Sequence, residues 1–233
     1  QNTAIGREVM VANTTGANNT AMGHNTLASN TSGGSNAAFG REALYSNTTG
    51  VNNTAIGYRS LYYNTTVSNN TAVGYEAAFN NSTGGVTALG RYAARQNTTG
   101  TANVAVGLSS AYNTTTGSYN TSLGHEALNQ NTTASNNTAV GYQAGYSNTT
   151  GTQNTAVGQQ ALLSATTANN NTAVGQQALY TTTTGGFNTA VGRQALYLNT
   201  TGTNNVAVGY EALEANTTAS NNTALGYQAG KSI

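Results

Sequence analysis

The sequence predicts an all-β fold: a parallel β-solenoid, or β-roll, of about fourteen coils of 17 residues, forming a single repeat domain over residues 1–233. A pentapeptide of the form Asn-Thr-Ala-Val-Gly recurs fourteen times, and its glycine returns every 17 residues, except for one interval of 16 between Gly74 and Gly90. A short fixed period across a whole chain indicates stacked copies of one unit, each in contact with its neighbours. Seventeen residues are too few for a helical hairpin, whose repeats need about 30 residues or more, and they suit short strands joined by turns.

Each coil is numbered from the first asparagine of the pentapeptide, so that residues 137–153 read Asn-Thr-Ala-Val-Gly-Tyr-Gln-Ala-Gly-Tyr-Ser-Asn-Thr-Thr-Gly-Thr-Gln. Positions 1–4, rich in Thr and Val, predict one strand, and positions 7–10 predict a second. Glycine at position 5 permits a bend or a positive φ, and Asn-Thr-Thr-Gly at positions 12–15 is typical of a turn. Position 4 is always apolar and position 9 is usually Leu. We expect these side chains, with small alanines at positions 3 and 8, to form a thin core.

The one missing residue lies at the end of the fifth coil, where Gly84 and Gly85 lead directly into Val86. A deletion inside a strand would turn the later side chains to the wrong face of the sheet. Because position 4 resumes in phase at Leu89, we expect the deletion to fall in a turn and to leave the strands aligned.

Two rows of like residues are expected along the stack. Position 1 is Asn in thirteen of the fourteen coils, and stacked asparagines can hydrogen bond to their copies in neighbouring coils. Position 10 is often aromatic, which predicts either stacking along an edge of the solenoid or an aromatic interface row, buried between subunits or against a partner. The members of this row are Tyr45, Tyr62, Phe79, Tyr112, Tyr146, Tyr180 and Tyr197.

Composition narrows the function classes. Charged residues make up 6% of the chain, the formal net charge is +1, and no block of charge is present that would bind nucleic acid or an anionic membrane surface. No apolar run approaches the roughly 20 residues of a membrane-spanning helix, so direct membrane insertion of this segment is not expected.

Catalysis and metal binding are not expected either, because they need unlike groups that converge, and this chain repeats like ones. His24 and His125 occupy the same position of coils that lie six apart, which is too far to share a metal. The chain contains no Asp, so the aspartate-rich calcium motif of other β-rolls is missing. We therefore expect a protein that is not an enzyme, with no catalytic residues, no metal and no cofactor.

Asn-x-Ser/Thr sequons occur at two positions of the coil and are candidate N-glycosylation sites on the outside of a turn. The alternative is that Asn-Thr-Thr-Gly is a favourable turn sequence that carries no glycan. Position 12 supplies Asn13, Asn30, Asn47, Asn64, Asn81, Asn97, Asn131, Asn148, Asn199 and Asn216. Position 17 adds Asn18, Asn52, Asn69, Asn136, Asn170 and Asn221.

Residues 103–107 and 205–209, both Asn-Val-Ala-Val-Gly, resemble the head repeat of trimeric autotransporter adhesins, which reads approximately Asn-Ser-Val-Ala-Ile-Gly. Full coils such as residues 137–153 are also similar to the repeat arrays of phage and bacterial fibre proteins. The resemblance covers essentially the whole chain, and it implies a left-handed parallel β-roll with three chains around a common axis. The coil here is longer than the adhesin unit, and positions 2 and 3 are mostly Thr-Ala rather than Val-Ala.

These features and the adhesin resemblance predict a structural and adhesive extracellular fibre segment, displayed at a cell surface or on a virion. The resemblance implies that it forms a homotrimer. A stiff rod with repeated rows would add many weak contacts with a host surface, matrix or carbohydrate receptor. The repeat is cut at both ends, so we expect a fragment of a longer fibre protein. One alternative is a self-assembling, N-glycosylated extracellular filament without a receptor. Another is an ice- or surface-binding protein, because Thr fills position 2 in eleven of the fourteen coils.

Overall fold

The computed structural model describes residues 1–232. The chain divides into two compact units, Gln1–Gly117 and Ser118–Ile233. Within the described residues there are fourteen short strands and no helices. Each unit is a parallel β-solenoid in which every coil contributes one strand, so the predicted fold class is confirmed. The single domain, the left-handed sense and the trimer stay predictions.

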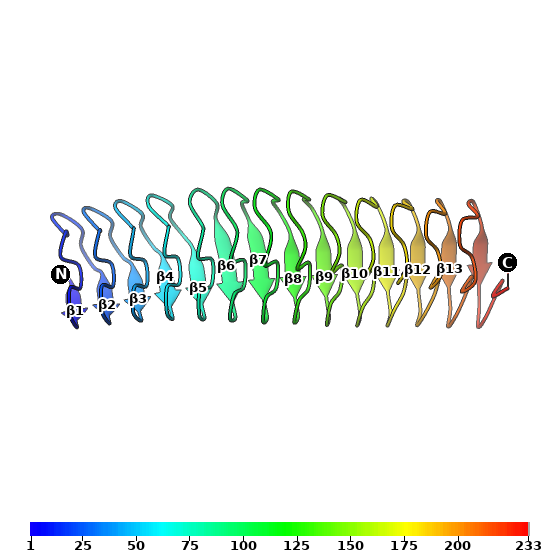
Figure 1. The fold of residues 1–233 in the computed structure, drawn as a ribbon, viewed down its shortest axis with the longest axis horizontal. Coiled ribbons are helices and arrows are strands. Elements are labelled where there is room, and N and C mark those ends of the chain that lie inside the picture. Colours follow the sequence, from blue (N-terminus) through cyan, green and yellow to red (C-terminus); the bar gives the residue numbers. More distant parts are fainter. Residues whose placement is uncertain (233) are drawn as a thin grey trace. The chain divides into compact units, whose positions relative to one another are not determined.

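In the first unit the strands lie side by side in chain order and pair in parallel (Figure 1). Like positions of the coil face one another, so that Ala4 lies opposite Ala21, and Ala21 lies opposite Ala38. The strands are β1 (Thr3–Ile5), β2 (Thr20–Met22), β3 (Ala37–Phe39), β4 (Thr54–Ile56), β5 (Thr71–Val73), β6 (Val86–Leu89) and β7 (Asn103–Val106).

The second unit repeats this arrangement (Figure 1). Its strands also pair in parallel in chain order, with Ala156 opposite Ala173 and Ala173 opposite Ala190. The strands are β8 (Thr121–Leu123), β9 (Thr138–Val140), β10 (Thr155–Val157), β11 (Thr172–Val174), β12 (Thr189–Val191), β13 (Val206–Val208) and β14 (Thr223–Leu225).

The short fifth coil keeps its strand in register with the next one. Thr71 pairs with Thr87 and Val73 with Leu89, so like positions still face each other across an offset of 16 residues. The missing residue lies outside the strands, as the phase of position 4 predicts.

Positions 7–10 form no strand in any described coil, so the predicted second strand is wrong. Positions 7 and 9 both have left-handed φ values, for example 57° at Gln160 and 52° at Leu162. A residue in this region cannot continue a pleated strand. The segment is a run of turns that hydrogen bonds to the next coil, as when the Leu162 N–H donates to the Ala178 carbonyl at 2.9 Å.

The core of each unit is thin and consists of positions 3, 8 and 9. Ala173 and Ala178, at positions 3 and 8, and Leu179, at position 9, are fully buried. Position 4 points outward instead: Ile5 is 51% exposed and Leu123 is 46% exposed. Side chains alternate along a strand, so positions 2 and 4 share its outer face while the small alanine of position 3 faces inward. The predicted core role is confirmed for position 9 and is wrong for position 4.

We expect Leu179→Ala to lower the free energy of unfolding by about 3 kcal/mol, because it empties a fully buried site and leaves a cavity. Val174→Ala, at the half-exposed position 4, is the control and should cost about 1 kcal/mol or less. Chemical denaturation followed by circular dichroism measures both changes. Equal losses would contradict the outward placement of position 4.

Candidate interaction surfaces

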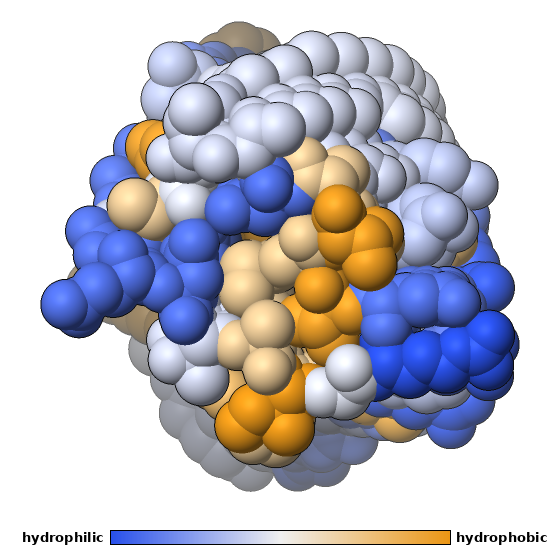
Figure 2. Space-filling model, turned by 90° about the vertical axis from the view of Figure 1, so that its left-hand side faces the viewer, coloured by the Kyte–Doolittle hydropathy of each residue, from blue (hydrophilic) through white to orange (hydrophobic). Residues whose placement is uncertain are grey.

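Residues at one position of the coil form a row along each unit because the coils stack in register. Figure 2, which looks onto the N-terminal end, shows residues of like hydropathy aligned in rows that run away from the viewer. Position 4 forms what we call the outer apolar row, which carries no polar side chain. An apolar row on the outer face of a largely polar chain is a candidate interaction surface. Its half-exposed or exposed members are Ile5, Met22, Phe39, Ile56, Val73, Leu89 and Val106 in the first unit, and Leu123, Val140, Val157, Val174, Val191, Val208 and Leu225 in the second.

Two asparagine rows are buried within each unit. At position 1, the Asn188 backbone N–H donates to the Asn171 Oδ1 at 2.9 Å, and the Asn171 Nδ2 donates to the Gly185 carbonyl at 3.0 Å. At position 12, the Asn47 Nδ2 donates to the Asn30 Oδ1 at 2.8 Å. The predicted asparagine ladder at position 1 is therefore confirmed, and a second ladder at position 12 accompanies it.

The position-12 sequons do not lie on the outside of the solenoid, so that part of the prediction is wrong. Their Nδ2 atoms, which would carry a glycan, donate to neighbouring groups instead; the Asn47 Nδ2 also reaches the Gly50 carbonyl at 3.1 Å. A glycan at these positions would break the ladder. Asn13 is half-exposed, and the other nine are buried: Asn30, Asn47, Asn64, Asn81, Asn97, Asn131, Asn148, Asn199 and Asn216.

The position-17 sequons lie on the surface. Asn170 is half-exposed. The other five are exposed: Asn18, Asn52, Asn69, Asn136 and Asn221. If the chain carries glycans, these residues are the better acceptors because their side chains lie outside the buried ladders.

The aromatic row at position 10 is half-buried along its whole length. The Tyr62 ring stacks between Tyr45, at 5.1 Å between ring centroids, and Phe79, at 5.3 Å. In the second unit the rings of Tyr180 and Tyr197 stack at 5.1 Å. These contacts support stacking along an edge of the solenoid, and burial of the row at an interface stays a prediction.

A second row, at position 6, combines tyrosine with arginine. In four successive coils of the first unit it reads Arg41, Tyr58, Tyr75 and Arg91, which we call the position-6 cluster. The Tyr58 and Tyr75 rings stack at 5.0 Å. The Arg41 guanidinium carbon lies 5.9 Å from the Tyr58 ring centroid, and that of Arg91 lies 5.7 Å from the Tyr75 centroid. Each arginine therefore lies against the neighbouring tyrosine.

Ion pairs at positions 7 and 10 lie beside this cluster. Glu42 Oε2 is 2.5 Å from Arg59 Nε, and Glu42 Oε1 is 3.2 Å from Arg41 Nε. Burial works to raise the pKa of the Glu42 carboxyl, but hydrogen bonds and charge from Arg59 and Arg41 outweigh it and hold the pKa below its usual range. Glu76 Oε2 pairs with Arg95 Nε at 2.7 Å. Glu42 is therefore a charged partner of arginine at neutral pH.

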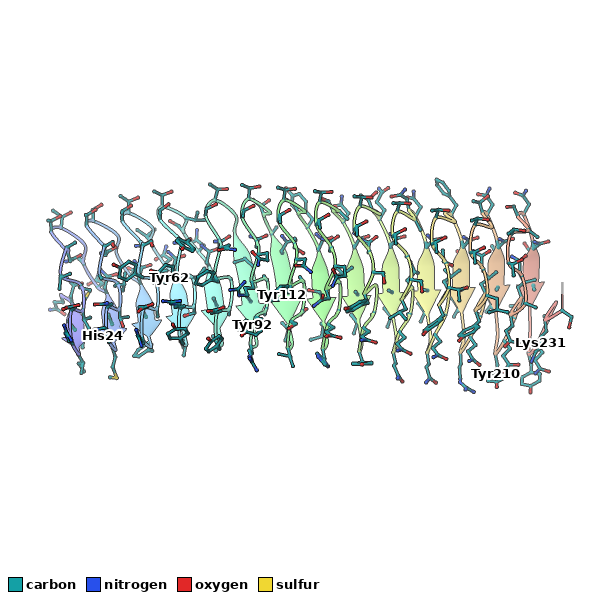
Figure 3. The ribbon with its side chains drawn as sticks, viewed as in Figure 1. His24, Tyr62, Tyr92, Tyr112, Tyr210 and Lys231 are labelled. Carbon is teal, nitrogen blue, oxygen red and sulfur yellow. The ribbon has the colours of Figure 1, made fainter. Side chains whose placement is uncertain are left out.

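The tyrosines next to these pairs belong to the same face of the first unit. Figure 3 labels Tyr62 in the fourth coil and Tyr92 and Tyr112 in the sixth and seventh coils. The Arg95 guanidinium carbon lies 5.7 Å from the Tyr92 ring centroid and 5.8 Å from that of Tyr112. The charges look scattered along the sequence. The 17-residue period places Arg41 in line with Tyr58 and Tyr75, because these three residues follow one another at that interval.

The two histidines lie in different units. His24, labelled in Figure 3, has its Nε2 3.9 Å from Glu8 Oε2, and His125 Nε2 is 3.8 Å from Glu126 Oε1. Across residues 1–232, no group of three or more His, Cys, Asp or Glu side chains gathers in a way that could hold a metal ion. The same range contains no helix with the length and apolar character of a membrane span.

The short fifth coil leaves a hollow on the surface of the first unit. It is open and has a volume of about 500 Å³. A Cβ added to Gly85 would meet no atom within 4 Å, so Gly85 faces open space. No charged residue lines it; its walls are Ser68, Asn69, Gly85, Val86, Thr87, Ala102, Asn103 and Val104.

Comparison with protein-family models, with curated proteins and with solved structures finds no match to this chain.

Proposed function

We propose that the chain is a structural and adhesive segment of an extracellular fibre, displayed on a cell surface or a virion, whose copies associate as a homotrimer. The observation that carries the proposal is the outer apolar row. All fourteen of its members are apolar, although only 37% of the whole chain is hydrophobic. A row with a fixed repeat is best covered by a surface with the same repeat, and copies of this chain have that repeat.

Each side chain of the outer apolar row that is covered on association adds a small favourable contribution to the free energy of binding. Covering the exposed part of one Val or Ile side chain contributes roughly 1 kcal/mol or less. The second unit offers five half-exposed valines in successive coils, at residues 140, 157, 174, 191 and 208. Together they can contribute a few kcal/mol per chain, which offsets part of the entropy lost on association.

Repetition supports the adhesive role. Neighbouring coils are joined by strand pairing and by buried asparagine ladders, which favours a stiff scaffold. Each surface row presents the same side chain many times, so weak contacts with a host surface, matrix or carbohydrate receptor can add through their effective concentration.

Light scattering on the purified chain tests the association. We expect three times the monomer mass, and we expect Val157→Lys combined with Val191→Lys to give a monomer, because charges on the outer apolar row cannot be buried without partners. The control combines Thr167→Lys with Thr201→Lys, two exposed residues at position 14 of the same coils, and should leave the trimer intact. A wild-type monomer would contradict the trimer.

A self-assembling filament is a second way to cover the same row. Electron microscopy separates the two arrangements, because discrete rods are expected for a trimer and long uniform filaments for open-ended assembly. Filaments that persist in the Val157→Lys, Val191→Lys variant would show that assembly uses another surface.

Ice binding is a second candidate function, favoured by the exposed threonines at position 14. Strand pairing spaces successive members of this row by about 4.8 Å, which presents hydroxyls at a regular interval. A thermal-hysteresis assay at millimolar protein decides this candidate, and no activity would remove it. The row includes Thr49, Thr66, Thr83 and Thr99 in the first unit and Thr133, Thr150, Thr167, Thr184 and Thr201 in the second.

A further inference from the structure

The excess positive charge of the first unit is concentrated around the position-6 cluster. Residues 1–117 contain five arginines and three glutamates, a net charge of +2. Arg7 and Glu8 pair at 3.1 Å and cancel. The other four arginines and two glutamates lie within residues 41–95, so this segment alone carries the +2. The outer apolar row and the asparagine ladders carry no charge.

Two of these arginines are placed to meet a ligand. Glu42 and Glu76 hold Arg59 and Arg95 in close ion pairs. Arg41 is exposed, with 60% of its side chain accessible, although its Nε touches Glu42. Arg91 is exposed, and in the described part of the chain it has no salt bridge to a carboxylate.

Arg91 is held by aromatic groups instead of by a carboxylate. Its guanidinium carbon lies 4.7 Å from the Tyr92 ring centroid, and its Nη2 is 3.3 Å from the Tyr92 hydroxyl. A guanidinium held over a ring keeps most of its N–H donors, and its planar fork pairs with a carboxylate through two hydrogen bonds. Arg91 is therefore oriented without being neutralised.

Between the two arginines lies an aromatic surface. The Tyr75 side chain is 43% exposed and Tyr58 is half-exposed. Three strand spacings separate Arg41 from Arg91 along the stack, or about 14 Å. The cluster thus presents a cationic group, two aromatic rings and a second cationic group along one line.

We propose that the position-6 cluster binds a linear acidic polysaccharide, with sugar rings packing against the outward edges and hydroxyls of the stacked Tyr58 and Tyr75 rings and carboxylates pairing with Arg41 and Arg91. This inference rests on the proposed adhesive function and names its ligand class. Aromatic side chains offer apolar surface and a hydroxyl in one group, which suits the C–H and O–H groups of a sugar ring. The two separated guanidinium groups suit a polymer with carboxylates at intervals.

A single-stranded nucleic acid is the main competing ligand, because bases also stack on tyrosine and arginine. It carries a phosphate on every nucleotide, and its affinity depends on several Lys or Arg contacts along the backbone. Beyond the cluster, the other arginines of residues 1–117 are Arg7, Arg59 and Arg95, and each of them pairs with a glutamate. The small number of exposed arginines in the cluster therefore favours an acidic polysaccharide, whose carboxylates are further apart than the phosphates of a nucleic acid.

The second unit contains a partial copy of the arrangement. Arg193, Tyr210 and Tyr227 occupy position 6 of successive coils, the Arg193 guanidinium carbon lies 5.5 Å from the Tyr210 ring centroid, and the two rings stack at 5.3 Å. The recurrence of arginine followed by stacked tyrosines supports a surface feature in its own right. Figure 3 labels Tyr210 in this copy.

Isothermal titration calorimetry with polygalacturonate oligomers tests the proposal on the whole chain. We expect binding to the wild-type protein, a loss of roughly tenfold for Arg91→Gln, and a larger loss when Arg41→Gln is added. Tyr75→Ala should weaken binding by a further factor of about five to ten. Arg7→Gln is the matched control at position 6 of the first coil and should bind like the wild type.

Competitors and folding measurements decide the outcome. Neutral dextran should not bind; equal affinity for polyglutamate would overturn the role of the sugar, and tighter binding of oligo(dT) would assign the cluster to nucleic acid. Unchanged affinity of the double arginine variant would also overturn the proposal. Circular dichroism verifies that each variant is folded. Light scattering separates this result from the fibre proposal, because a trimer that fails to bind polygalacturonate loses only the ligand assignment.

Discussion

Gly158→Ala is expected to destabilise the second unit by about 4 kcal/mol or more. Gly158 has a φ of 134°, which side chains other than glycine rarely adopt. A Cβ on this residue would lie 2.5 Å from the carbonyl oxygen of Gly175 and 2.6 Å from its carbonyl carbon, which are backbone atoms of the next coil. Neither atom can rotate away, so the coils must separate or the strand must shift. The loss appears in the denaturation midpoint followed by circular dichroism.

Gly85→Ala is the control for this effect. An added Cβ at Gly85 meets no atom within 4 Å, and its φ lies outside the strained positive region. We expect a change within about 0.5 kcal/mol, of either sign. A similar large loss for both variants would mean that coil spacing at position 5 does not limit the fold.

Asn171→Ala is expected to cost about 3 kcal/mol. Asn171 is buried, its Oδ1 accepts the Asn188 backbone N–H, and its Nδ2 donates to the Gly185 carbonyl. Removing the amide leaves both buried backbone groups without these partners, and each unsatisfied group costs about 1–3 kcal/mol. Position 12 of this coil is Thr182, so no neighbouring asparagine at that position supplies a second amide to Gly185.

Asn188→Ala provides a graded comparison one coil later. It removes the acceptor of the Asn205 backbone N–H, but the Gly202 carbonyl still accepts from Asn199 Nδ2 at 3.2 Å. We expect a loss about 1 kcal/mol smaller than that of Asn171→Ala. Thr167→Ala, at an exposed position, should be near neutral. Equal losses for both asparagine variants would show that the hydrogen bond from Asn199 does not compensate for the lost donor at the Gly202 carbonyl.

The period of the sequence was enough to predict the stacking of the coils and the register of the strands. A parallel strand pair with like residues opposite each other follows from a repeat of constant length, and the 16-residue coil obeys the same rule. The core was harder to assign. In the strand Thr-Ala-Val, alternation permits either face to point inward, and the larger apolar residue is the natural choice for a core. The interior is so narrow that the strand contributes only alanine, and Leu179 and its equivalents enter from the opposite side of the coil.

The turns carried a weaker signal still. A left-handed backbone conformation usually occurs at glycine. Most coils nevertheless have leucine at position 9, and Leu162 has a φ of 52°. Glycine stands at that position in Gly145 and Gly230, both with a φ of 60°. Those two coils held the only local evidence against a second strand. Asparagine at position 12 was ambiguous for a related reason, because it favours both open turns and buried ladders.

The hollow beside Gly85 has a consequence for the proposed association between copies of this chain. Proteins made of nearly identical repeats are prone to pairing with the wrong repeat, in their own chain or in another. A copy displaced by one coil would meet almost the same side chains and lose little energy. The 16-residue coil breaks that equivalence within the first unit, because a displaced copy would set a short turn against a full one. One deleted residue can thus fix the register between copies of the chain that could otherwise pair with a shift of one coil.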